Sequence, residues 1–339
     1  MSVVSVRLTI AICLSTAAAL GALALITAAG VHTIEASHPP TGRFVPVEAG
    51  RLHVLELGPA DAPPVVLLHG AGTNLEDMRL ALGDRLAASF RVILIDRPGH
   101  GWSDRPGGSM DASPSRQAEL THQALAQIGI KRAVLVAHSW SGALATAYAL
   151  DYPESVSGLV LLAPLTHPWP MTVAWPNSIM KATLATGVSL AAGKVSGPLF
   201  VRTMVLPFGK LLHGVSIQSV FAPQIPPQDY VARTGADLFL RPSEFTANTE
   251  DISQLRAFLE AQAPKYGAIH RPTVILVGEL DEVAPPAVHA RPLAKSLPRS
   301  ELVVLPGIGH MLHFASPERV SEAIARMTRL DGRYVAESR

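Results

Sequence analysis

Short, continuously apolar runs alternate along this chain with longer segments that have helical patterns of apolar residues. The runs are rich in Val, Ile and Leu, which is typical of strands buried on both faces of a parallel sheet. They comprise residues 63–70, 91–99, 132–139, 158–164, 272–279 and 300–307. The helical patterns comprise residues 75–88, 114–128, 141–151, 286–297 and 317–330. The alternation predicts an α/β fold, in which helices cover both faces of a mostly parallel sheet.

Two further strands are expected before the first parallel one. Residues 43–58 contain two extended runs on either side of Ala49-Gly50, which predicts an antiparallel hairpin. The hairpin and the six apolar runs together predict an eight-stranded sheet.

The interval from 165 to 271 breaks the alternation, because it contains no apolar run of this kind. It is too long for a plain loop in a compact domain. Residues 165–245, rich in Pro, Leu, Ala and Met, predict a helical cap, and residues 250–262 predict a helix that returns to the sheet. Large apolar side chains suggest that the cap forms an apolar substrate pocket, although packing within the cap explains any single one as well. They are Trp169, Trp175, Phe200 and Phe208.

Residues 8–31 form an uncharged segment of 24 residues, which as a helix would span about 36 Å. This segment is longer than the apolar core of a signal peptide and long enough to cross a bilayer, so it predicts a transmembrane anchor. Arg7 precedes the segment, which favours a cytoplasmic position for residues 1–7 and export of the catalytic domain. The alternative is a signal peptide that is cleaved near residues 22–24, which would release a secreted domain.

The polar, proline-containing residues 32–42 predict a linker between the anchor and the folded domain. The folded domain is then expected to consist of a first core part at 43–164, the cap at 165–245 and a second core part at 246–339.

Composition excludes several classes of function. The chain has 339 residues, 48% of them hydrophobic, so it can bury a large core. Its formal net charge is +1 and it has no run of basic residues, which argues against nucleic acid as a partner. The single cysteine, Cys13, lies in the anchor, and the chain has neither an HExxH sequence nor a phosphate-binding glycine loop. We therefore expect no metal and no cofactor, while the sequence does not set the oligomeric state.

Chemically useful residues follow five of the predicted strands, at the ends where parallel sheets bind ligands. They are the loops 69–72 and 96–101, and the side chains Ser139, Asp281 and His310. Ser139 lies between a strand and a helix, and its small neighbours Ala137 and Ser141 permit the sharp turn on which a nucleophilic serine is presented. The start of the following helix favours negative charge at this position.

A nucleophilic serine needs a base, and the base needs a carboxylate that orients it. His310 lies in a glycine-rich loop after the last strand, and we select it over His313, which lies inside the apolar start of a helix. Asp281 lies in the loop just beyond a strand. Glu279 and Glu282 are alternatives of the same chemical type, but the first falls at the strand end and the second leads into the sequence VAPP.

These segments resemble the α/β-hydrolase family, whose catalytic residues occur in the order Ser, Asp, His. The similar sequences are LLHGAG, DRPGHGWSDRP, VAHSWSG, VGELDEVAPP and GIGHMLHFASPERV, within residues 43–330. The resemblance implies that Ser139 is the nucleophile, Asp281 the acid and His310 the base. It also implies an oxyanion hole formed by the amides of Ala71 and Trp140. Ala137 and Ser141 depart from the glycines usual in the family.

The resemblance implies acyl transfer through an acyl-enzyme, and we expect the substrate to be a carboxylic ester of a largely apolar small molecule. Serine at the turn argues against epoxide hydrolases and haloalkane dehalogenases, whose nucleophile is aspartate. Carbon–carbon bond hydrolases and cofactor-free haloperoxidase-like enzymes use the same triad and are alternatives. A noncatalytic, membrane-anchored binding protein is a further alternative, although such a protein would be expected to lose part of the triad.

Overall fold

The computed structural model describes residues 3–169 and 196–337, and within them it contains one eight-stranded sheet. The strand order is β1-β2-β4-β3-β5-β6-β7-β8. The strands are β1 (Arg43–Val47), β2 (Gly50–Leu57), β3 (Pro64–Leu68), β4 (Arg91–Ile95), β5 (Ala133–His138), β6 (Val156–Leu162), β7 (Thr273–Gly278) and β8 (Ser300–Leu305). β2 pairs antiparallel with both β1 and β4, and the remaining pairs are parallel. The predicted hairpin and the mostly parallel eight-stranded sheet are confirmed.

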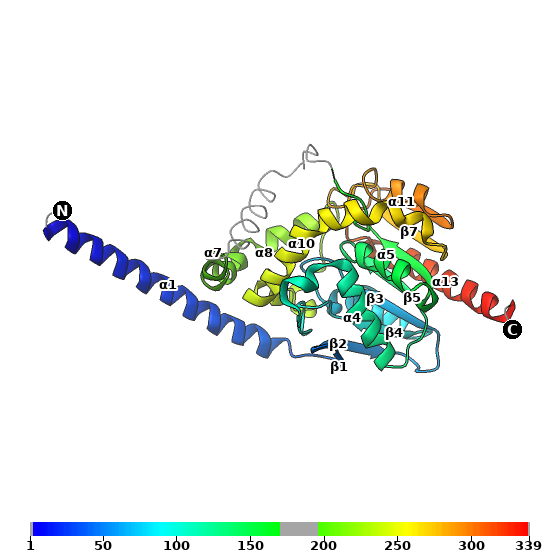
Figure 1. The fold of residues 1–339 in the computed structure, drawn as a ribbon, viewed down its shortest axis with the longest axis horizontal. Helices are drawn as coiled ribbons and strands as arrows, with labels where there is room; N and C mark the ends of the chain where they lie inside the picture. The colour runs from blue at the N-terminus through cyan, green and yellow to red at the C-terminus, as the bar shows by residue number, and fades with distance from the viewer. Residues whose placement is uncertain (1–2, 170–195, 338–339) are drawn as a thin grey trace.

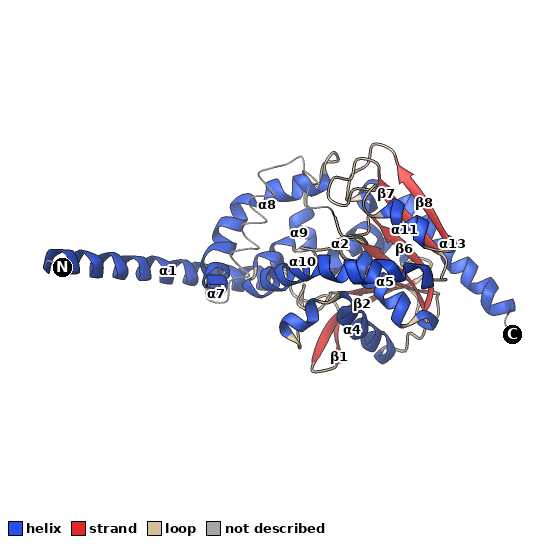
Figure 2. Ribbon diagram, turned by 45° about the horizontal axis from the view of Figure 1, so that its top comes forward, coloured by secondary structure: helices blue, strands red, loops and turns tan. Residues whose placement is uncertain are grey.

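Helices cover both faces of this sheet (Figures 1 and 2). Those of the core are α2 (Leu75–Met78), α3 (Asp84–Leu86), α4 (Pro114–Gln127), α5 (Ser141–Asp151), α11 (Ala290–Ser296), α12 (Leu312–Ala315) and α13 (Pro317–Glu337). A π-helical turn at Arg79–Gly83 separates α2 from α3, so the helix predicted at 75–88 is divided. Short 3₁₀ turns connect other elements, at Gly108–Ala112, Pro153–Ser155, Ala236–Leu240 and Ala263–Ala268.

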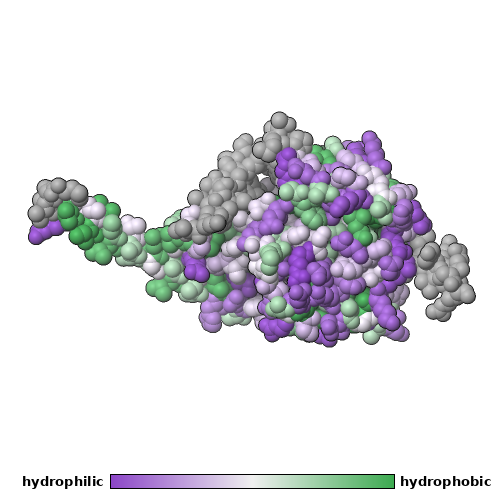
Figure 3. Space-filling model, viewed as in Figure 1, coloured by the Kyte–Doolittle hydropathy of each residue, from purple (hydrophilic) through white to green (hydrophobic). Residues whose placement is uncertain are grey.

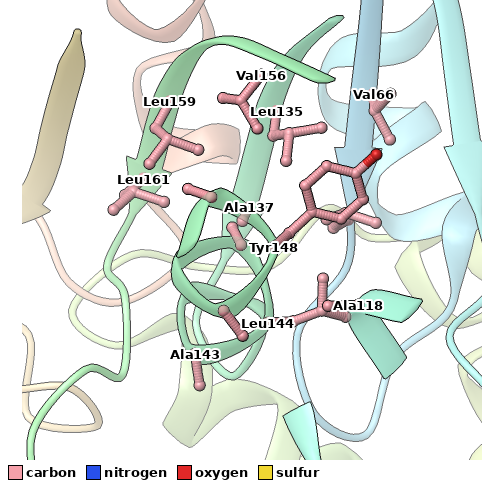
Figure 4. Close-up of a cluster of buried hydrophobic side chains, with 14 of the residues drawn as sticks. Val66, Ala118, Leu135, Ala137, Ala143, Leu144, Tyr148, Val156, Leu159 and Leu161 are labelled. Atoms are coloured by element: carbon pink, nitrogen blue, oxygen red, sulfur yellow. The ribbon is translucent and has the colours of Figure 1, made fainter. Parts of the chain in front are cut away.

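The parallel strands contribute side chains to two hydrophobic layers, because successive residues of a strand point to opposite faces. In β5, Leu135 and Ala137 belong to the layer that contains α4 and α5, and Val134 and Val136 belong to the layer that contains α13. Figure 4 shows the first layer, with Leu135 and Ala137 beside Tyr148 of α5. Burial on both faces explains the continuously apolar runs, and it fixes the positions of the strand ends at which the candidate residues lie.

The cap between β6 and β7 includes α7 (Ser196–Phe200), α8 (Leu206–Phe221), α9 (Tyr230–Thr234) and α10 (Pro242–Gln262). A π-helical segment at Val201–Val205 joins α7 to α8. α10 is a single helix that crosses the predicted boundary at 245 and contains the helix predicted at 250–262. The return to the sheet therefore begins inside the cap.

The N-terminal helix α1 runs from Val3 to Ser37 and projects from the body of the molecule (Figure 1). The helix is long and apolar enough to cross a membrane. It also corrects the predicted linker at 32–42, because residues 32–37 are helical and only 38–42 connect to β1. Continuation of the helix buries Ile34 against Leu206 and Leu238 of the cap region. The free energy of this apolar contact offsets the weak helix preference of the polar residues at 32–37.

Candidate active site

Ser139 occupies a strained turn between β5 and α5. Its φ of 53° lies in the left-handed region, which costs a non-glycine residue roughly 1–3 kcal/mol. Three backbone hydrogen bonds hold the turn: the Ser139 amide donates to the Leu162 carbonyl, and the Ser139 carbonyl accepts from the amides of Gly142 and Leu165, each at 2.9 Å. The neighbouring strand and the loop that follows it thus impose the conformation expected of a serine presented at the edge of the sheet.

Ser141 and Gly142 explain how the chain forms this turn with a serine at position 141. A Cβ atom on Gly142 would lie 2.5 Å from the Cβ of Pro164, so only glycine fits there without movement. Ser141 is fully buried, and its hydroxyl donates to the backbone carbonyl of His69 at 2.5 Å. The serine that replaces the usual glycine therefore ties the turn to the loop after β3.

Asp281 and His310 form a buried pair at the same edge of the sheet. His310 Nδ1 lies 2.9 Å from Asp281 Oδ2, and the other carboxylate oxygen accepts from the amides of Val283 and Ala284 at 2.9 and 2.8 Å. Because an ionised carboxylate only accepts hydrogen bonds, Nδ1 of His310 carries the proton and Nε2 is left as an acceptor. This is the tautomer that a general base requires.

The alternative residues lie in other contacts. His313 Nε2 lies 3.1 Å from Asp77 Oδ2, and Glu279 accepts from the Gly307 amide at 3.2 Å. The ring of His138, the residue before Ser139, lies near both histidines, with centroids 4.8 Å from His310 and 4.3 Å from His313. The carboxylate partners therefore distinguish the two histidines, because His310 pairs with Asp281 and His313 pairs with Asp77.

The loop after β3, residues 69–72, passes close to this turn. A Cβ atom on Gly70 would lie 3.2 Å from Ser139 Cβ, so the loop approaches the serine with little room for a side chain. The amide of Gly72 donates to Asn248 Oδ1 of α10 at 2.8 Å. The carbonyls of His69 and Gly70 accept from Ser141 and Arg97. Neighbouring elements thus fix the loop that carries the predicted oxyanion amide of Ala71.

Comparison with known proteins identifies the fold family. A family model described as the alpha/beta hydrolase fold matches residues 63–317. This chain belongs to the α/β-hydrolase family. Its curated relatives include the 2-hydroxy-6-oxononadienedioate/2-hydroxy-6-oxononatrienedioate hydrolase of Paraburkholderia phymatum, 27% identical over 86% of this chain and 97% of the relative. The pimeloyl-(acyl-carrier protein) methyl ester esterase of Edwardsiella ictaluri is 29% identical over 80% of this chain and 94% of the relative.

Solved structures with the same fold include a bacterial membrane phospholipase A, described as a virulence factor. It aligns with a TM-score of 0.64 and 25% identity, over 96% of this chain and 98% of its own. The relatives are hydrolases that act on different bonds, so the comparisons establish a hydrolase and leave the bond open.

Arg97 is a buried cation in this hydrolase that sequence reasoning did not single out. Its guanidinium donates to Gly70 O at 3.1 Å and to Asp251 Oδ2 of α10 at 2.7 Å, and it lies 4.1 Å from the centroid of the Trp140 ring. Arg97 therefore contacts both the loop after β3 and the residue after Ser139. The backbone amide of Arg97 donates to His69 Nε2 at 3.0 Å. Burial, together with the nearby Arg97 charge, holds the pKa of His69 well below its usual range and keeps the ring a neutral acceptor.

Asp251 joins α10 of the cap to this part of the core. Besides Arg97 it accepts from His100 Nε2 at 2.9 Å, from Arg105 at 3.1 Å and from Gln117 at 3.1 Å. Burial alone would raise the pKa of its carboxyl, but the adjacent Arg97 and the bond from His100 lower it to about 2. The loop 96–101, expected to contribute to the site, does so by supporting it through this ionic network.

A second buried cluster could offer metal ligands. Asp77, His138 and His313 bring potential ligand atoms within 4.8 Å of one another, and all three are buried. The Asp77 oxygens already accept from Tyr230 Oη at 2.7 Å and pair with His313 Nε2. Since Tyr230 belongs to α9, this cluster is a second hydrogen-bonded connection between the cap and the core.

The large apolar residues of the cap do not all face the site. Trp169 packs edge-on against the His289 ring, with centroids 5.9 Å apart, and Phe200 is partly buried. Phe208 is 51% exposed, so it does not pack in the core of the cap, and its place in a substrate pocket stays a prediction. Trp175 lies outside the described residues.

Proposed function

We propose that this protein is a membrane-anchored serine hydrolase that cleaves a carboxylic ester of a largely apolar small molecule. The observation that carries the proposal is the buried His310–Asp281 pair beside a serine held at positive φ after a parallel strand. In this arrangement a base whose Nε2 can accept a proton and a serine in a strained turn lie at one sheet edge, which suits nucleophilic catalysis.

The chemistry proceeds in two acyl-transfer steps. His310 takes the proton of Ser139, and the alkoxide attacks the ester carbonyl to form a tetrahedral intermediate. The amides of Ala71 and Trp140 stabilise its oxyanion, and neither donates to a backbone carbonyl among the described residues. The intermediate then expels the alcohol, which receives the proton from His310. Water, activated by His310, releases the acid, while Asp281 holds the imidazole and supports its positive charge.

Two observations favour an apolar ester at a membrane. The esterase relative and the membrane phospholipase A both carry ester hydrolysis in their names, and the alignment with the phospholipase covers 96% of this chain. α1 is long and apolar enough to cross a membrane, and Arg7 precedes its apolar segment. These features favour an uncleaved anchor, with the catalytic domain on the exported side of the membrane, over a secreted domain.

Labelling with a fluorophosphonate probe tests the nucleophile. Full-length wild type in detergent is compared with Ser139→Ala and with Thr121→Val, a control that removes a buried hydroxyl in α4, away from the turn. We expect label on wild type and on the control, and none on Ser139→Ala. Label that persists in Ser139→Ala, or is absent from folded wild type, would refute the assignment and favour a noncatalytic binding protein.

A substrate panel tests the bond. The carbon–carbon hydrolase alternative has a named relative at 27% identity, so p-nitrophenyl esters and vinylogous diketones are compared on the same preparation. Hydrolysis of esters in preference to diketones supports the proposal. Activity on diketones alone would assign the triad to carbon–carbon cleavage, and peroxide-dependent halogenation without ester cleavage would assign it to the haloperoxidase-like alternative.

A further inference from the structure

The helix α8 of the cap presents hydrophobic side chains to solvent. Phe208, Leu211, Leu212 and Val215 occupy positions i, i+3, i+4 and i+7, and they are 51, 75, 48 and 64% exposed. These four residues, here called the α8 stripe, lie on one face because a helix turns once every 3.6 residues. The surface helix of a soluble domain normally places such a stripe toward the core, so an apolar face turned outward indicates an interaction surface.

The α8 stripe begins close to the point where α1 would leave a bilayer. A membrane core of about 30 Å needs about 20 helical residues, so a span that starts at Leu8 ends near Thr27. One face of α1 becomes covered over the last two turns of this span, since Leu20, Leu23 and Ala24 are partly buried and Thr27 is 3% exposed. α1 therefore meets the rest of the protein near the end of its membrane-spanning length.

The first residue of α8 packs on α1 just beyond this point. A Cβ atom on Gly30 would lie 2.7 Å from Leu206 Cδ2, which shows how closely the two helices approach. Gly30 lies about 4.5 Å farther along the helix axis than Thr27. Figure 2 shows α7 and α8 at the end of the body from which α1 projects, and Figure 3 shows the hydrophobic side chains along α1. The start of α8 thus lies within one helical turn of the membrane boundary.

The charge of this part of the cap also suits a membrane surface. Residues 155–228 contain no Asp or Glu, but they contain the basic residues Lys181, Lys194, Arg202 and Lys210. Arg202 and Lys210, near the α8 stripe, are exposed. Anionic lipid headgroups attract such basic side chains.

We propose that the α8 stripe inserts into the boundary between headgroups and acyl chains of the leaflet in which α1 ends. The cap then has two membrane contacts, α1 across the bilayer and α8 along its surface. If the proposed function holds, the cap would receive lipid-soluble esters from the bilayer itself. The contact with lipid does not depend on that function and is tested separately.

Fluorescence in reconstituted vesicles tests the contact. The chain's only cysteine, Cys13, is changed to alanine, and a single cysteine is introduced in full-length protein by Leu211→Cys or by Met110→Cys. Both native side chains are 75% exposed, so Met110, in the 3₁₀ turn at Gly108–Ala112, is a matched control outside the stripe. Each cysteine carries an environment-sensitive fluorophore. The vesicles contain phosphatidylcholine and phosphatidylglycerol, with or without bromine on the acyl chains.

We expect the label at position 211 to show blue-shifted emission and to lose intensity with brominated lipid, whereas the label at position 110 does neither. Equal, weak quenching at both positions would overturn the proposal. Emission at 211 that responds to protein dilution but not to bromine would instead assign the α8 stripe to a second copy of the chain. Blue-shifted emission that responds to neither would assign it to residues 170–195 of the same chain.

A second variant measures the consequence for activity. Leu211→Glu places a charge in the α8 stripe, and Met110→Glu is its control. We expect Leu211→Glu to lower the rate on a long-chain ester embedded in vesicles relative to the rate on a soluble p-nitrophenyl ester, and Met110→Glu to leave this ratio unchanged. An unchanged ratio in Leu211→Glu would count against the inserted stripe. Inactivity of wild type on every ester would refute the proposed function, and the quenching result would still decide the membrane contact.

Discussion

Replacement of Asp251 by asparagine should destabilise the hydrolase strongly, although the two side chains have nearly the same volume. The carboxylate is fully buried and accepts from Arg97 at 2.7 Å and His100 at 2.9 Å. Asparagine keeps a single acceptor oxygen and turns an NH₂ group toward donors. Arg97, whose side chain is also fully buried, then lacks its closest counter-charge.

Two routes give the magnitude. Removing one partner of a buried ion pair typically costs about 3–5 kcal/mol, because the remaining charge stays desolvated. The pKa gives a smaller figure: a carboxyl lowered from 3.8 to about 2 contributes about 2 kcal/mol at neutral pH. The second route counts only the ionisation of Asp251, whereas the substitution also leaves the buried Arg97 guanidinium without its closest counter-charge. We therefore expect the free energy of unfolding to fall by about 3–5 kcal/mol at pH 7.

The pH dependence follows from the direction of the shift. Because the folded-state pKa of Asp251 is lowered, its contribution is complete above the unfolded value of 3.8 and is lost as the pH falls toward 2. The difference in urea midpoint between wild type and Asp251→Asn should be constant from pH 7 to about 5 and should shrink between about pH 4 and 2.

Glu260→Gln is the control, since it removes an ion pair on the same helix at the surface. Glu260 lies 2.9 Å from Arg256, with side chains 51 and 41% exposed, and such pairs contribute about 0.5 kcal/mol or less. Urea unfolding followed by tryptophan fluorescence compares the three proteins. If Asp251→Asn unfolds at the same midpoint as Glu260→Gln, the Arg97–Asp251 pair does not stabilise the fold and the reasoning fails.

Two further substitutions test the turn at Ser139, each with a control elsewhere in the chain. Ser141→Gly restores the usual glycine but removes the bond to the loop after β3; we expect a loss of about 1 kcal/mol of stability and a lower kcat in ester hydrolysis. Thr121→Val removes a buried hydroxyl bond elsewhere and should lower stability with kcat unchanged; equal kcat in both variants would contradict a role for Ser141 in positioning. Gly142→Ala should destabilise the fold by about 1–3 kcal/mol, because the added Cβ would lie 2.5 Å from the Cβ of Pro164. Gly214→Ala, which has open space around the added Cβ, is the control and should be neutral or stabilising. Thermal unfolding compares the two variants.

The sheet and the His310–Asp281 pair could be predicted because each leaves a local signal. Strands buried on both faces are apolar at every position, so they stand out from amphipathic helices without knowledge of their partners. A parallel sheet collects the ends of its strands at one edge. The sequence order therefore placed His310 near Asp281 without any structural information.

The support of the site could not be predicted in this way. Arg97 and Asp251 are 154 positions apart, and nothing near either residue indicates the other. Whether an acidic residue in a long helix faces a buried arginine depends on how the cap folds back over the core. A buried Arg in the loop after β4 predicts that some carboxylate pairs with it, since an unpaired buried cation is costly, but the partner comes only from the tertiary structure.

The exposure of Phe208 could not be predicted for a related reason. Sequence reasoning assigns apolar side chains to the inside of a domain, and this assumption holds when water is the only solvent. A chain with a membrane anchor has a second solvent, and an apolar stripe beside the anchor can face it. Residues 32–37 were predicted to be a linker from their polar character. They are helical because this part of α1 packs on the cap, a tertiary contact that the local sequence does not reveal.

Ser141 shows why departure from a family pattern can strengthen a functional interpretation. Glycine near a nucleophile avoids crowding, so a larger residue at this position appears at first to argue against a working turn. The structure shows that the added hydroxyl faces the carbonyl of His69 and satisfies an acceptor in the loop that carries Ala71. Gly142 retains the close approach to Pro164, so position 141 is free to make a bond that glycine cannot make. Serine at position 141 therefore couples the turn at Ser139 to the proposed oxyanion loop, and a substitution that moves either segment should also shift the position of the other.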